Sequence, residues 1–426
     1  MTPMQTWLIE PHDPLSARDG RPFNNTPGAR ATSLPFPTPT MLAGAARTLA
    51  GSDPTSGRFT ASTDHVLTWE MRGPLLVELR GATSDITWLV PAPADALLLR
   101  HDDMTKARRK QFVPIALPMD TLTDLKGSHK DLHLIGPRDY DPAKPLNAPP
   151  TFWYWQEALA WLTAPLHQDQ DVTLSELGHR GPLPEGRVHV GIDPATQTAS
   201  EGMLFQTRGL EFTHHQHGTP PLEVARLALA LASNAPLRET VAPIGGERRL
   251  ARWQAATTPL PGTAPEIEAI SKAIAHTGGC RVLLLTPALF NGGFQPDAQS
   301  YLVQPSAGAN LQISVCGVAV ARAQVLSGWD MIVDNGTGKP KGAPKATRRF
   351  VPGGTVLFLK VTGDADAIQD WVKQHWMQCI SDGKQERRDG FGLAVFGVWS
   401  GEPETIVWGK HHASTEEHTV TSEPYS

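Results

Sequence analysis

The chain of 426 residues has few cysteines, no long apolar run and no excess of positive charge. Its three cysteines, Cys280, Cys316 and Cys379, lie far apart and are odd in number, so they fit neither a disulfide framework nor a paired-cysteine metal site. We expect reduced core thiols. No window approaches the ~18 consecutive apolar residues of a membrane span, and no basic leader precedes an apolar stretch at the N-terminus. These absences predict a cytoplasmic protein.

The charge balance excludes binding to an anionic polymer through a global positive field. The formal net charge is −5, so such binding would need local basic patches. Apolar residues make up 40% of the chain and charged residues 19%, which predicts packed globular structure. The length exceeds what one hydrophobic core usually spans, and two domains are therefore expected.

Signatures of common enzymes are also scarce. The densest histidine group, His214, His215 and His217, has no carboxylate or cysteine at a metal-ligand spacing, and we interpret it as a solvated loop. His12 and Asp13 are adjacent on an extended segment, where neighbouring side chains point to opposite sides, so an acid/base pair is disfavoured. The segment NGTGKP at 335–340 lacks the earlier glycine of a phosphate-binding loop. The residues predict no catalytic site, no metal and no cofactor.

Apolar patterns predict strands alternating with helices. Strands are expected at residues 5–9, 74–79, 86–90, 281–290 and 355–361, the second and third of them as a hairpin. Helices are expected after Thr38 or Thr40, over 222–232 as a nearly all-apolar buried helix, and over 364–380. The later strand, helix, glycine-rich loop and strand form half of a ferredoxin-like unit, and the first half is interpreted as another such unit.

The segment 100–150 is polar, is broken by prolines and carries the basic run KARRKQ at 106–111. We interpret it as an insertion into the first unit.

Positive charge gathers in three segments. No acidic residue occurs between residues 335 and 363, where the cations include Lys341, Lys345, Arg348 and Arg349. Two further segments join arginines to glycines: Gly245 and Gly246 with Arg248, Arg249 and Arg252, and Gly390 and Gly392 with Arg387 and Arg388. Glycines let backbone amides approach an anion, and arginines bind phosphate through two hydrogen bonds. Single-stranded RNA is the common ligand this composition favours, and solvated basic loops are the alternative.

Several long blocks together resemble a known family. They read DPLSARDGRPF, LPFPTPTMLAGAARTL, IDPATQTASEGMLFQTRGLEF, IGGERRLARW, LLLTPALFNGGFQPD and DGFGLAVFGVW. Their order and approximate positions are similar to those in the third subunits of Cmr complexes, which are RAMP-superfamily proteins of type III-B CRISPR effectors. The resemblance runs from residue 7 to about residue 399, and the polar tail from residue 409 lies outside it.

The resemblance implies an α+β fold of two ferredoxin-like, RRM-related domains with insertions. We expect them at 1–262, with the insertion near 100–150, and at 263–426, with the glycine-rich loop at 383–392. It implies a non-catalytic subunit that caps the 5′ tag of the CRISPR RNA and bridges the large polymerase-like subunit to the first backbone subunit, with target RNA close by. The RNA contacts it carries onto this chain are Arg18, Arg21, Arg47, Gly245, Gly246, Arg248, Arg249, Arg387, Arg388, Gly390 and Gly392.

Two alternatives remain open at this point. The same superfamily contains metal-independent CRISPR RNA-processing endoribonucleases, and such an activity would need a general base such as His12 or a histidine of 214–217. A structural scaffold whose basic loops bind acidic protein faces is the other alternative. Steep salt dependence of RNA affinity would argue against the scaffold.

Overall fold

The computed structural model describes most of the chain, in these ranges: residues 3–17, 30–31, 33–80, 85–117, 121, 123, 125, 131–139, 141–164, 169–215, 224–305, 308–330 and 343–406. Four residues named above, Arg18, Arg21, His217 and Lys341, lie outside the described residues, as does the tail from residue 409. Within these ranges, no helix has the length and apolar character needed to cross a membrane.

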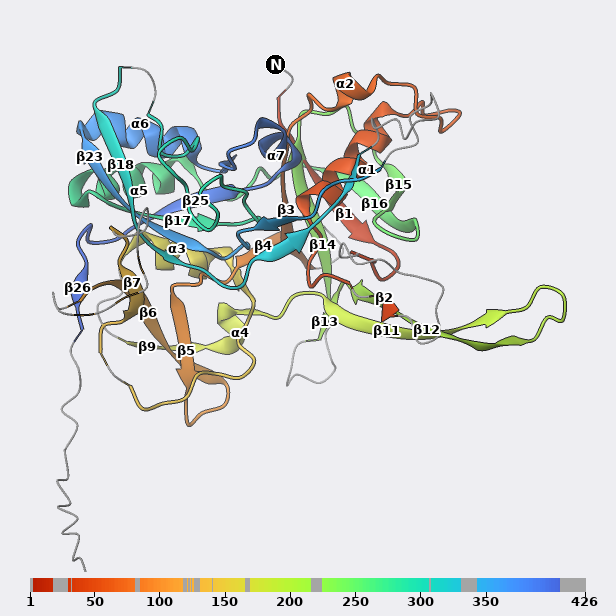
Figure 1. Cartoon of the computed structure of the whole chain (residues 1–426), viewed down its shortest axis with the longest axis horizontal. Helices are drawn as coiled ribbons and strands as arrows, with labels where there is room; N and C mark the ends of the chain where they lie inside the picture. The colour runs from red at the N-terminus through yellow and green to blue at the C-terminus, as the bar shows by residue number, and fades with distance from the viewer. Residues whose placement is uncertain are drawn as a thin grey trace, which may run out of the picture.

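The first half of the chain is built on one antiparallel sheet (Figure 1). Its strands follow the order β10 (Gly178–His179), β8 (Phe152–Tyr154), β4 (Asp85–Pro91), β3 (Met71–Arg80), β14 (Val224–Ser233), β1 (Gln5–Pro11), β16 (Arg249–Ala256) and β15 (Thr240–Ile244), with β13 (Thr213–His215) beside β14. The strand predicted at 5–9 is confirmed as β1. The predicted hairpin is confirmed as β3 and β4, which pair with Leu76 opposite Leu89.

The helix predicted over residues 222–232 is wrong, because this segment supplies the central strand β14 between β3 and β1. Its leucines at 227, 229 and 231 pack into one core, and its alanines at 228 and 230 pack into the core on the other face of the sheet. A central strand is buried on both faces, so it shows a continuous apolar run. A short run of apolar residues shows neither the 3.6-residue period of a helix nor the two-residue period of a strand. The sequence pattern therefore cannot distinguish a buried strand from a buried helix here.

Helix α1 (Pro39–Gly51) covers one face of this sheet and begins after Thr38, as predicted. Proline suits the first helical position, because its ring fixes φ at a helical value. The backbone N–H that proline lacks would have no partner within the helix at this position. Leu42, Ala46 and Leu49 of α1 share a core with the leucines of β14. The short helix α2 (Thr63–Val66) follows, and α3 (Trp155–Thr163) packs against β4.

The second half forms a five-stranded antiparallel sheet of β18 (Leu311–Ala319), β23 (Val356–Gly363), β17 (Gly279–Leu284), β25 (Leu393–Val398) and β24 (Gln378–Cys379). Helices α5 (Ala264–Thr277) and α6 (Ala365–His375) pack against each other and contact β25. The strand predicted at 355–361 is confirmed as β23. Two expected elements are shorter than predicted: the strand at 281–290 ends at Leu284, and the helix at 364–380 ends at His375.

The two halves share one topological feature. The strand order β3-β14-β1-β16 in the first half and β18-β23-β17-β25 in the second both read 2-3-1-4 when each set is numbered along the chain. A ferredoxin-like unit joins its strands in this order, with helices after the first and third strands. In the first half α1 occupies the first helix position, and in the second half α6 occupies the second. The predicted mixture of helices with several antiparallel sheets is confirmed, while the count of ferredoxin-like domains stays a prediction.

Smaller sheets surround these two. The predicted insertion and its neighbours form β5 (Ala96–Arg100), β6 (Lys106–Ala116), β7 (Leu134–Pro137), β9 (Gln170–Thr173) and β26 (Glu404–Thr405), with α4 (Leu174–Leu177) after β9. The strands β11 (Leu183–Ile192) and β12 (Ala199–Glu211) form a long hairpin with β2 (Arg30–Ala31) beside it. Two short pairs are β19 (Gln324–Leu326) with β22 (Arg348–Phe350), and β20 (Trp329–Asp330) with β21 (Ala343–Pro344).

The three cysteines are free thiols, as predicted. Cys280 and Cys379 are buried, and Cys316 is partly exposed. Burial raises the pKa of the Cys379 thiol to about 12, so this thiol stays protonated and unreactive at neutral pH.

Candidate nucleic-acid interface

The early segment and the central glycine pair meet beside α1. Ser16 bridges to Gly246, whose N–H donates to the Ser16 carbonyl oxygen at 2.9 Å. Gly245 has φ of 70°, and a Cβ there would lie 3.0 Å from both the Met41 Sδ of α1 and the Ser16 carbonyl oxygen. Glycine at this position therefore permits the close approach of the early segment, the turn at 245–248 and the first turn of α1.

The segment that leads toward Arg18 is also anchored here. Leu15 bridges to Leu210, and the Ala17 carbonyl oxygen accepts the N–H of Leu34 at 2.7 Å. The Ala17 N–H donates to the Ser33 Oγ at 3.1 Å. The described residues on both sides of 18–29 thus lie beside the turn at 245–248.

The C-terminal glycine segment arrives at the same end of α1. Residues 383–392, which the sequence predicts as a loop, contain the helix α7 (Lys384–Asp389), and Gly390 ends it with φ of 102°. A Cβ on Gly390 would lie 2.6 Å from the Gly73 carbonyl oxygen and 3.4 Å from the Pro39 Cβ. The predicted loop is corrected to a short helix with a glycine stop, because Gly390 adopts the left-handed conformation that ends helices.

The strand pair β19 and β22 completes the arrangement. Phe391 stacks on Phe350 with ring centroids 4.6 Å apart, and Leu326 joins them in a small core. Gly328 is close enough to α1 that a Cβ there would contact the Thr40 Cγ2 at 3.5 Å, and its carbonyl oxygen accepts the N–H of Lys345 at 2.8 Å. The three basic segments of the sequence are therefore brought together around the N-terminal end of α1.

We expect Gly390→Ala to lower the free energy of unfolding by about 2 kcal/mol or more, since the left-handed φ strains an L residue and the new Cβ would meet backbone oxygen. Gly44→Ala in α1 is the matched control. Nothing lies within 4 Å of a Cβ on Gly44, and alanine inside a helix is favoured by roughly 0.5–1 kcal/mol. Urea unfolding of both variants measures the difference, and a Gly390→Ala protein as stable as Gly44→Ala would contradict this packing.

Arg47 is the most buried of the predicted RNA-contacting arginines that the structure describes. Its Nη1 donates to the Asp389 Oδ1 at 2.5 Å, its Nε to the Val66 carbonyl oxygen at 3.0 Å and its Nη2 to the Trp69 carbonyl oxygen at 3.0 Å. The side chain is 10% exposed. Because protein acceptors already engage these donors, the position of Arg47 argues for holding α7 against α1 rather than for direct contact with phosphate.

Three other predicted arginines are partly exposed and hold acceptors of their own. Arg348 donates to the Glu386 Oε1 at 2.6 Å, and Arg249 donates to Glu247 at 2.7 Å. Burial disfavours ionisation of Glu386, but the hydrogen bond from Arg348, a backbone hydrogen bond and the nearby charges of Arg348 and Lys345 together outweigh it, so the pKa of this carboxyl lies below its ordinary value. Arg387 donates to two backbone oxygens and lies 4.1 Å over the Tyr301 ring. These pairs orient the guanidinium groups along the edge of the site.

Arg248, Arg349 and Arg388 provide the more available charge. Arg248 and Arg349 are exposed, and Arg388 is partly exposed. Arg248 follows Gly245 and Gly246 in the turn and has φ of 52°. A left-handed arginine is uncommon and marks a backbone fixed by its surroundings. These side chains come from the turn at 245–248, from β22 and from α7.

Arg252 is exposed but lies on the other side of the sheet. Its neighbours Ala251 and Trp253 on β16 pack into the core beneath α1, and successive side chains of a strand point to opposite faces. The sequence pattern grouped Arg252 with Arg248 and Arg249 because of spacing alone. In the structure Arg252 lies on the face of the sheet opposite to α1, away from the N-terminal end of that helix.

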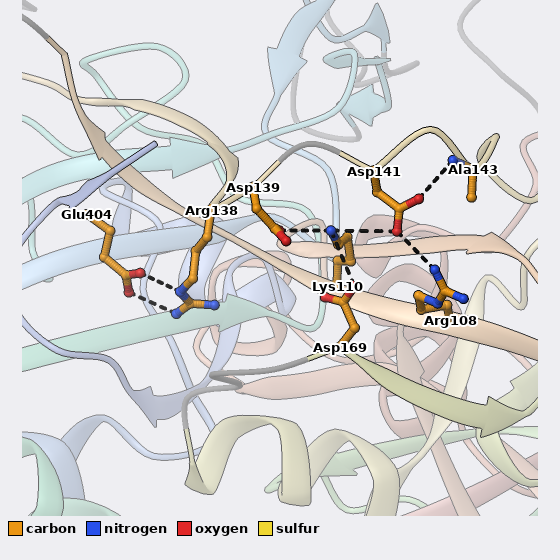
Figure 2. Close-up of polar contacts among 8 residues, drawn as sticks. All are labelled: Arg108, Lys110, Arg138, Asp139, Asp141, Ala143, Asp169 and Glu404. Carbon is orange, nitrogen blue, oxygen red and sulfur yellow. Dashed lines mark hydrogen bonds and ion pairs between the residues drawn. The ribbon is translucent and has the colours of Figure 1, made fainter. Parts of the chain in front are cut away.

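The basic run at 106–111 is neutralised within the insertion, in β6 (Figure 2). The Lys110 side chain is 3% exposed, and its Nζ lies 2.8 Å from Asp139, 3.3 Å from Asp169 and 3.7 Å from Asp141. Burial alone would lower the pKa of Lys110, but the hydrogen bonds to Asp139 and Asp169 and the negative charges of these two carboxylates together outweigh burial, so the pKa is raised. Arg108 pairs with Asp141 at 3.2 Å. These pairs hold the insertion together and leave the run with less free positive charge than its sequence suggests.

A second pair in the same region joins the insertion to the C-terminal strand. Arg138, directly after β7, donates to both carboxylate oxygens of Glu404 in β26, one of them at 2.8 Å (Figure 2). The insertion therefore folds against residues from the end of the second half.

The described histidines do not form a metal site. No group of three His, Cys, Asp or Glu side chains that could hold a metal ion occurs in the part of the chain that the structure describes. His12 follows β1 directly and is exposed. Its backbone N–H donates to the Leu250 carbonyl oxygen at 2.9 Å. His214 and His215 lie in β13 rather than in the predicted loop, because they pair with Ala225 and Val224 of β14.

The sequence pattern does not mark three residues that shape the site, Ser16, Met41 and Asp389. Asp389 lies between Arg388 and Gly390, two residues that the sequence pattern does mark, and this position is the one sequence feature that could have pointed to it. Ser16 and Met41 carry no signal of their own, since their roles come from contacts with the glycine turn.

One family model matches most of this chain. The family model described as CRISPR-associated protein (Cas_Cmr3) matches residues 7–399 of the chain. No curated protein matches it. Similar solved structures include two cryo-EM structures of the Type III-B Cmr-beta bound to cognate target RNA, one of them also with AMPPnP. In each structure the matching chain is 13% identical in sequence, and the match covers 83% of this chain and 86% of that chain. The TM-score is 0.39 for the structure with AMPPnP and 0.41 for the other.

Proposed function

Because this chain belongs to the Cas_Cmr3 family of CRISPR-associated proteins, we propose that it is a non-catalytic RNA-binding subunit of a type III-B effector complex. In this proposal it caps the 5′ tag of the CRISPR RNA and bridges the large polymerase-like subunit to the first backbone subunit. The observation that carries the proposal is the convergence of three basic, glycine-containing segments on the N-terminal end of α1.

The chemistry of this surface suits a single-stranded phosphate backbone. Gly245 and Gly246 leave the main chain of the turn uncovered by side chains, and the exposed Arg248 follows them. Arginine binds phosphate through two parallel hydrogen bonds, and glycine lets a backbone approach the ligand closely. The anchored ends at Ala17 and Leu34 would present Arg18 and Arg21 to the same ligand.

We also propose two ferredoxin-like, RRM-related domains at residues 1–262 and 263–426. The shared 2-3-1-4 strand order supports this division. The surface built by α1, the turn at 245–248 and α7 would then contain residues of both domains, so RNA binding would depend on how the two are packed together.

Binding of the purified chain to short RNAs tests the proposal. We expect a guide RNA that carries its repeat-derived 5′ tag to bind at least about 10-fold more tightly than the same RNA with a scrambled tag, measured by fluorescence anisotropy at several salt concentrations. Equal affinity for both RNAs would contradict tag recognition. Affinity without steep salt dependence would support a scaffold instead.

The same preparation distinguishes the enzymatic alternative. We expect repeat RNA incubated with the chain in EDTA to stay intact. Specific cleavage that is abolished in His12→Ala would establish a metal-independent endoribonuclease and contradict the non-catalytic role.

A further inference from the structure

Arg387 of α7 lies over an exposed aromatic ring at the border of the proposed RNA surface. Its Cζ is 4.1 Å from the centroid of the Tyr301 ring, and Tyr301 is 39% exposed. Arg387 is itself partly exposed, and the next residue of α7 is Arg388, one of the available arginines. We call Arg387 and Tyr301 the arginine–tyrosine stack.

Ser381 and Asp382 hold both members of this stack in place. The Arg387 Nη1 donates to the carbonyl oxygens of Ser381 at 2.7 Å and Asp382 at 2.6 Å. The backbone N–H of Tyr301 donates to the Asp382 carboxylate at 3.3 Å, and the Ser300 hydroxyl donates to the same carboxylate at 2.9 Å. A ligand would therefore meet a guanidinium plane that is already ordered, and binding would cost little further side-chain entropy.

Rings that lead into the core support Tyr301. The ring centroids of Tyr301 and His375 are 5.5 Å apart, and those of His375 and Trp371 are 5.6 Å apart. Burial lowers the pKa of His375, so its imidazole is neutral at neutral pH and adds no positive charge beside Arg387. The core thus anchors the tyrosine, and the tyrosine carries the guanidinium at the surface.

The Arg387 guanidinium offers its plane more than its donors. Because Nη1 already serves two carbonyl oxygens, the end-on fork that binds a carboxylate through both Nη atoms is not available. Among the described residues, Tyr301 is the one ring that this guanidinium contacts. Unpaired RNA bases stack on aromatic rings and on arginine planes, so a base suits this group better than an acidic side chain does.

Arg388 supplies a phosphate contact next to this plane. Successive residues of a helix are about 100° apart around its axis and about 1.5 Å apart along it, so the two arginines leave α7 in adjoining directions. The main chain at Arg388 is also held, because its carbonyl oxygen accepts the Arg47 Nη2 at 3.4 Å. A nucleotide whose phosphate binds Arg388 would have its base within reach of Arg387.

We infer that one unpaired base of the bound RNA stacks on the arginine–tyrosine stack while its phosphate binds Arg388. This inference rests on the proposed function, since it takes single-stranded guide RNA at the N-terminal end of α1 as the ligand. Stacking tolerates any base, because every base has a π-face. The subsite therefore fixes the position of one nucleotide and not its identity, which sets the register of the tag on the surface.

Single abasic nucleotides, placed in turn at each position of the 5′ tag, locate the stacked base without altering the protein. We expect one abasic position to lower the affinity of the full chain about 10-fold in fluorescence anisotropy, since the stacking of one base is lost. For Tyr301→Ala, affinity for the intact RNA should fall by a similar factor. The same abasic position should then cost nothing more, because the two changes remove one interaction.

Arg387→Lys separates the plane from the charge. Lysine keeps the positive charge, so the slope of log K against log salt should stay at the wild-type value while affinity for the intact RNA falls about 5-fold. Tyr301→Phe keeps the ring and should bind like the wild type. Phe59→Ala is the matched control, because Phe59 is 47% exposed and lies beyond the C-terminal end of α1, and it should also bind like the wild type.

Several outcomes would overturn the inference. One is an abasic profile that is the same for the wild type and Tyr301→Ala. Another is wild-type RNA affinity in both Tyr301→Ala and Arg387→Lys, which would leave the arginine–tyrosine stack to a protein ligand. A loss in Tyr301→Phe as large as that in Tyr301→Ala would assign the contact to the hydroxyl and not to the ring. Failure of the unmodified chain to prefer tagged over scrambled RNA would instead contradict the proposed function.

Discussion

Replacing Arg281 with methionine is expected to lower the free energy of unfolding by about 3–5 kcal/mol. Arg281 lies in β17 and its side chain is 0% exposed. Its Nη1 donates to the Asp95 Oδ2 at 2.8 Å, its Nε donates to the Val398 carbonyl oxygen at 2.8 Å, and its Nη2 donates to the Trp161 carbonyl oxygen. Removing the guanidinium would leave the Asp95 carboxylate buried without its cation.

The large effect follows from what this side chain joins. Trp161 lies in α3, which packs between β4 of the first sheet and β25 of the second, and Asp95 directly precedes β5 of the insertion. Asp95 also accepts the Trp161 Nε1 hydrogen at 2.9 Å. One cation in the second half thus binds acceptors from the first half and from the insertion boundary, and its loss would weaken the contact among all three.

Two controls separate this effect from the loss of any ion pair. Asp95→Leu combined with Arg281→Met removes both charges, and the pair of changes should cost less than the sum of the single ones, since no unpaired charge stays buried. Lys272→Met breaks the ion pair with Glu268 on the surface, where the Lys272 side chain is 64% exposed and the Glu268 side chain is 40% exposed. This change should alter the free energy of unfolding by less than about 1 kcal/mol. Guanidinium unfolding followed by tryptophan fluorescence measures all of them. An Arg281→Met variant as stable as Lys272→Met would refute the role of the buried cation.

Local patterns predicted α1, which has a buried and an exposed side, and the short apolar runs that end at turn residues. The strand at 5–9, the hairpin of β3 with β4, and α1 are confirmed, although these strands are buried on both faces. The pattern failed at β14, where leucines and alanines fill two different cores and no polar face remains. The information that makes this segment a strand lies in its partners, β1 and β3, which are more than a hundred residues away along the chain.

The candidate site shows the same division between local and distant information. Composition identified the turn at 245–248 and the segment around Arg388, and the structure brings both to α1. Composition could not show that Arg47 differs from the available arginines, because its carboxylate partner, Asp389, is 342 residues away along the chain. Nor could it show that Lys110 is neutralised, since three aspartates from other segments supply the opposite charge.

Removing the available arginines at the α1 end should weaken RNA binding strongly. For Arg248→Ala, Arg349→Ala and Arg388→Ala combined, we expect affinity for tagged guide RNA to fall about 10- to 100-fold at moderate salt, since each lost phosphate contact also loses the release of counterions. The slope of log K against log salt should become shallower by roughly 0.7 per contact, or about 2 for all three. Fluorescence anisotropy across a salt series measures both quantities on the same samples.

A matched triple variant decides whether position or total charge controls binding. Arg58→Ala, Arg180→Ala and Arg252→Ala remove three exposed arginines, so both triple variants change the formal net charge from −5 to −5 − 3 = −8. Arg252 lies across the sheet from α1, Arg180 follows β10 at the far edge of the first sheet, and Arg58 lies beyond the C-terminal end of α1. We expect this control to keep the wild-type salt slope and nearly its affinity. Equal losses in the two variants would mean that RNA responds to total charge alone, and the N-terminal end of α1 would then not be its binding surface.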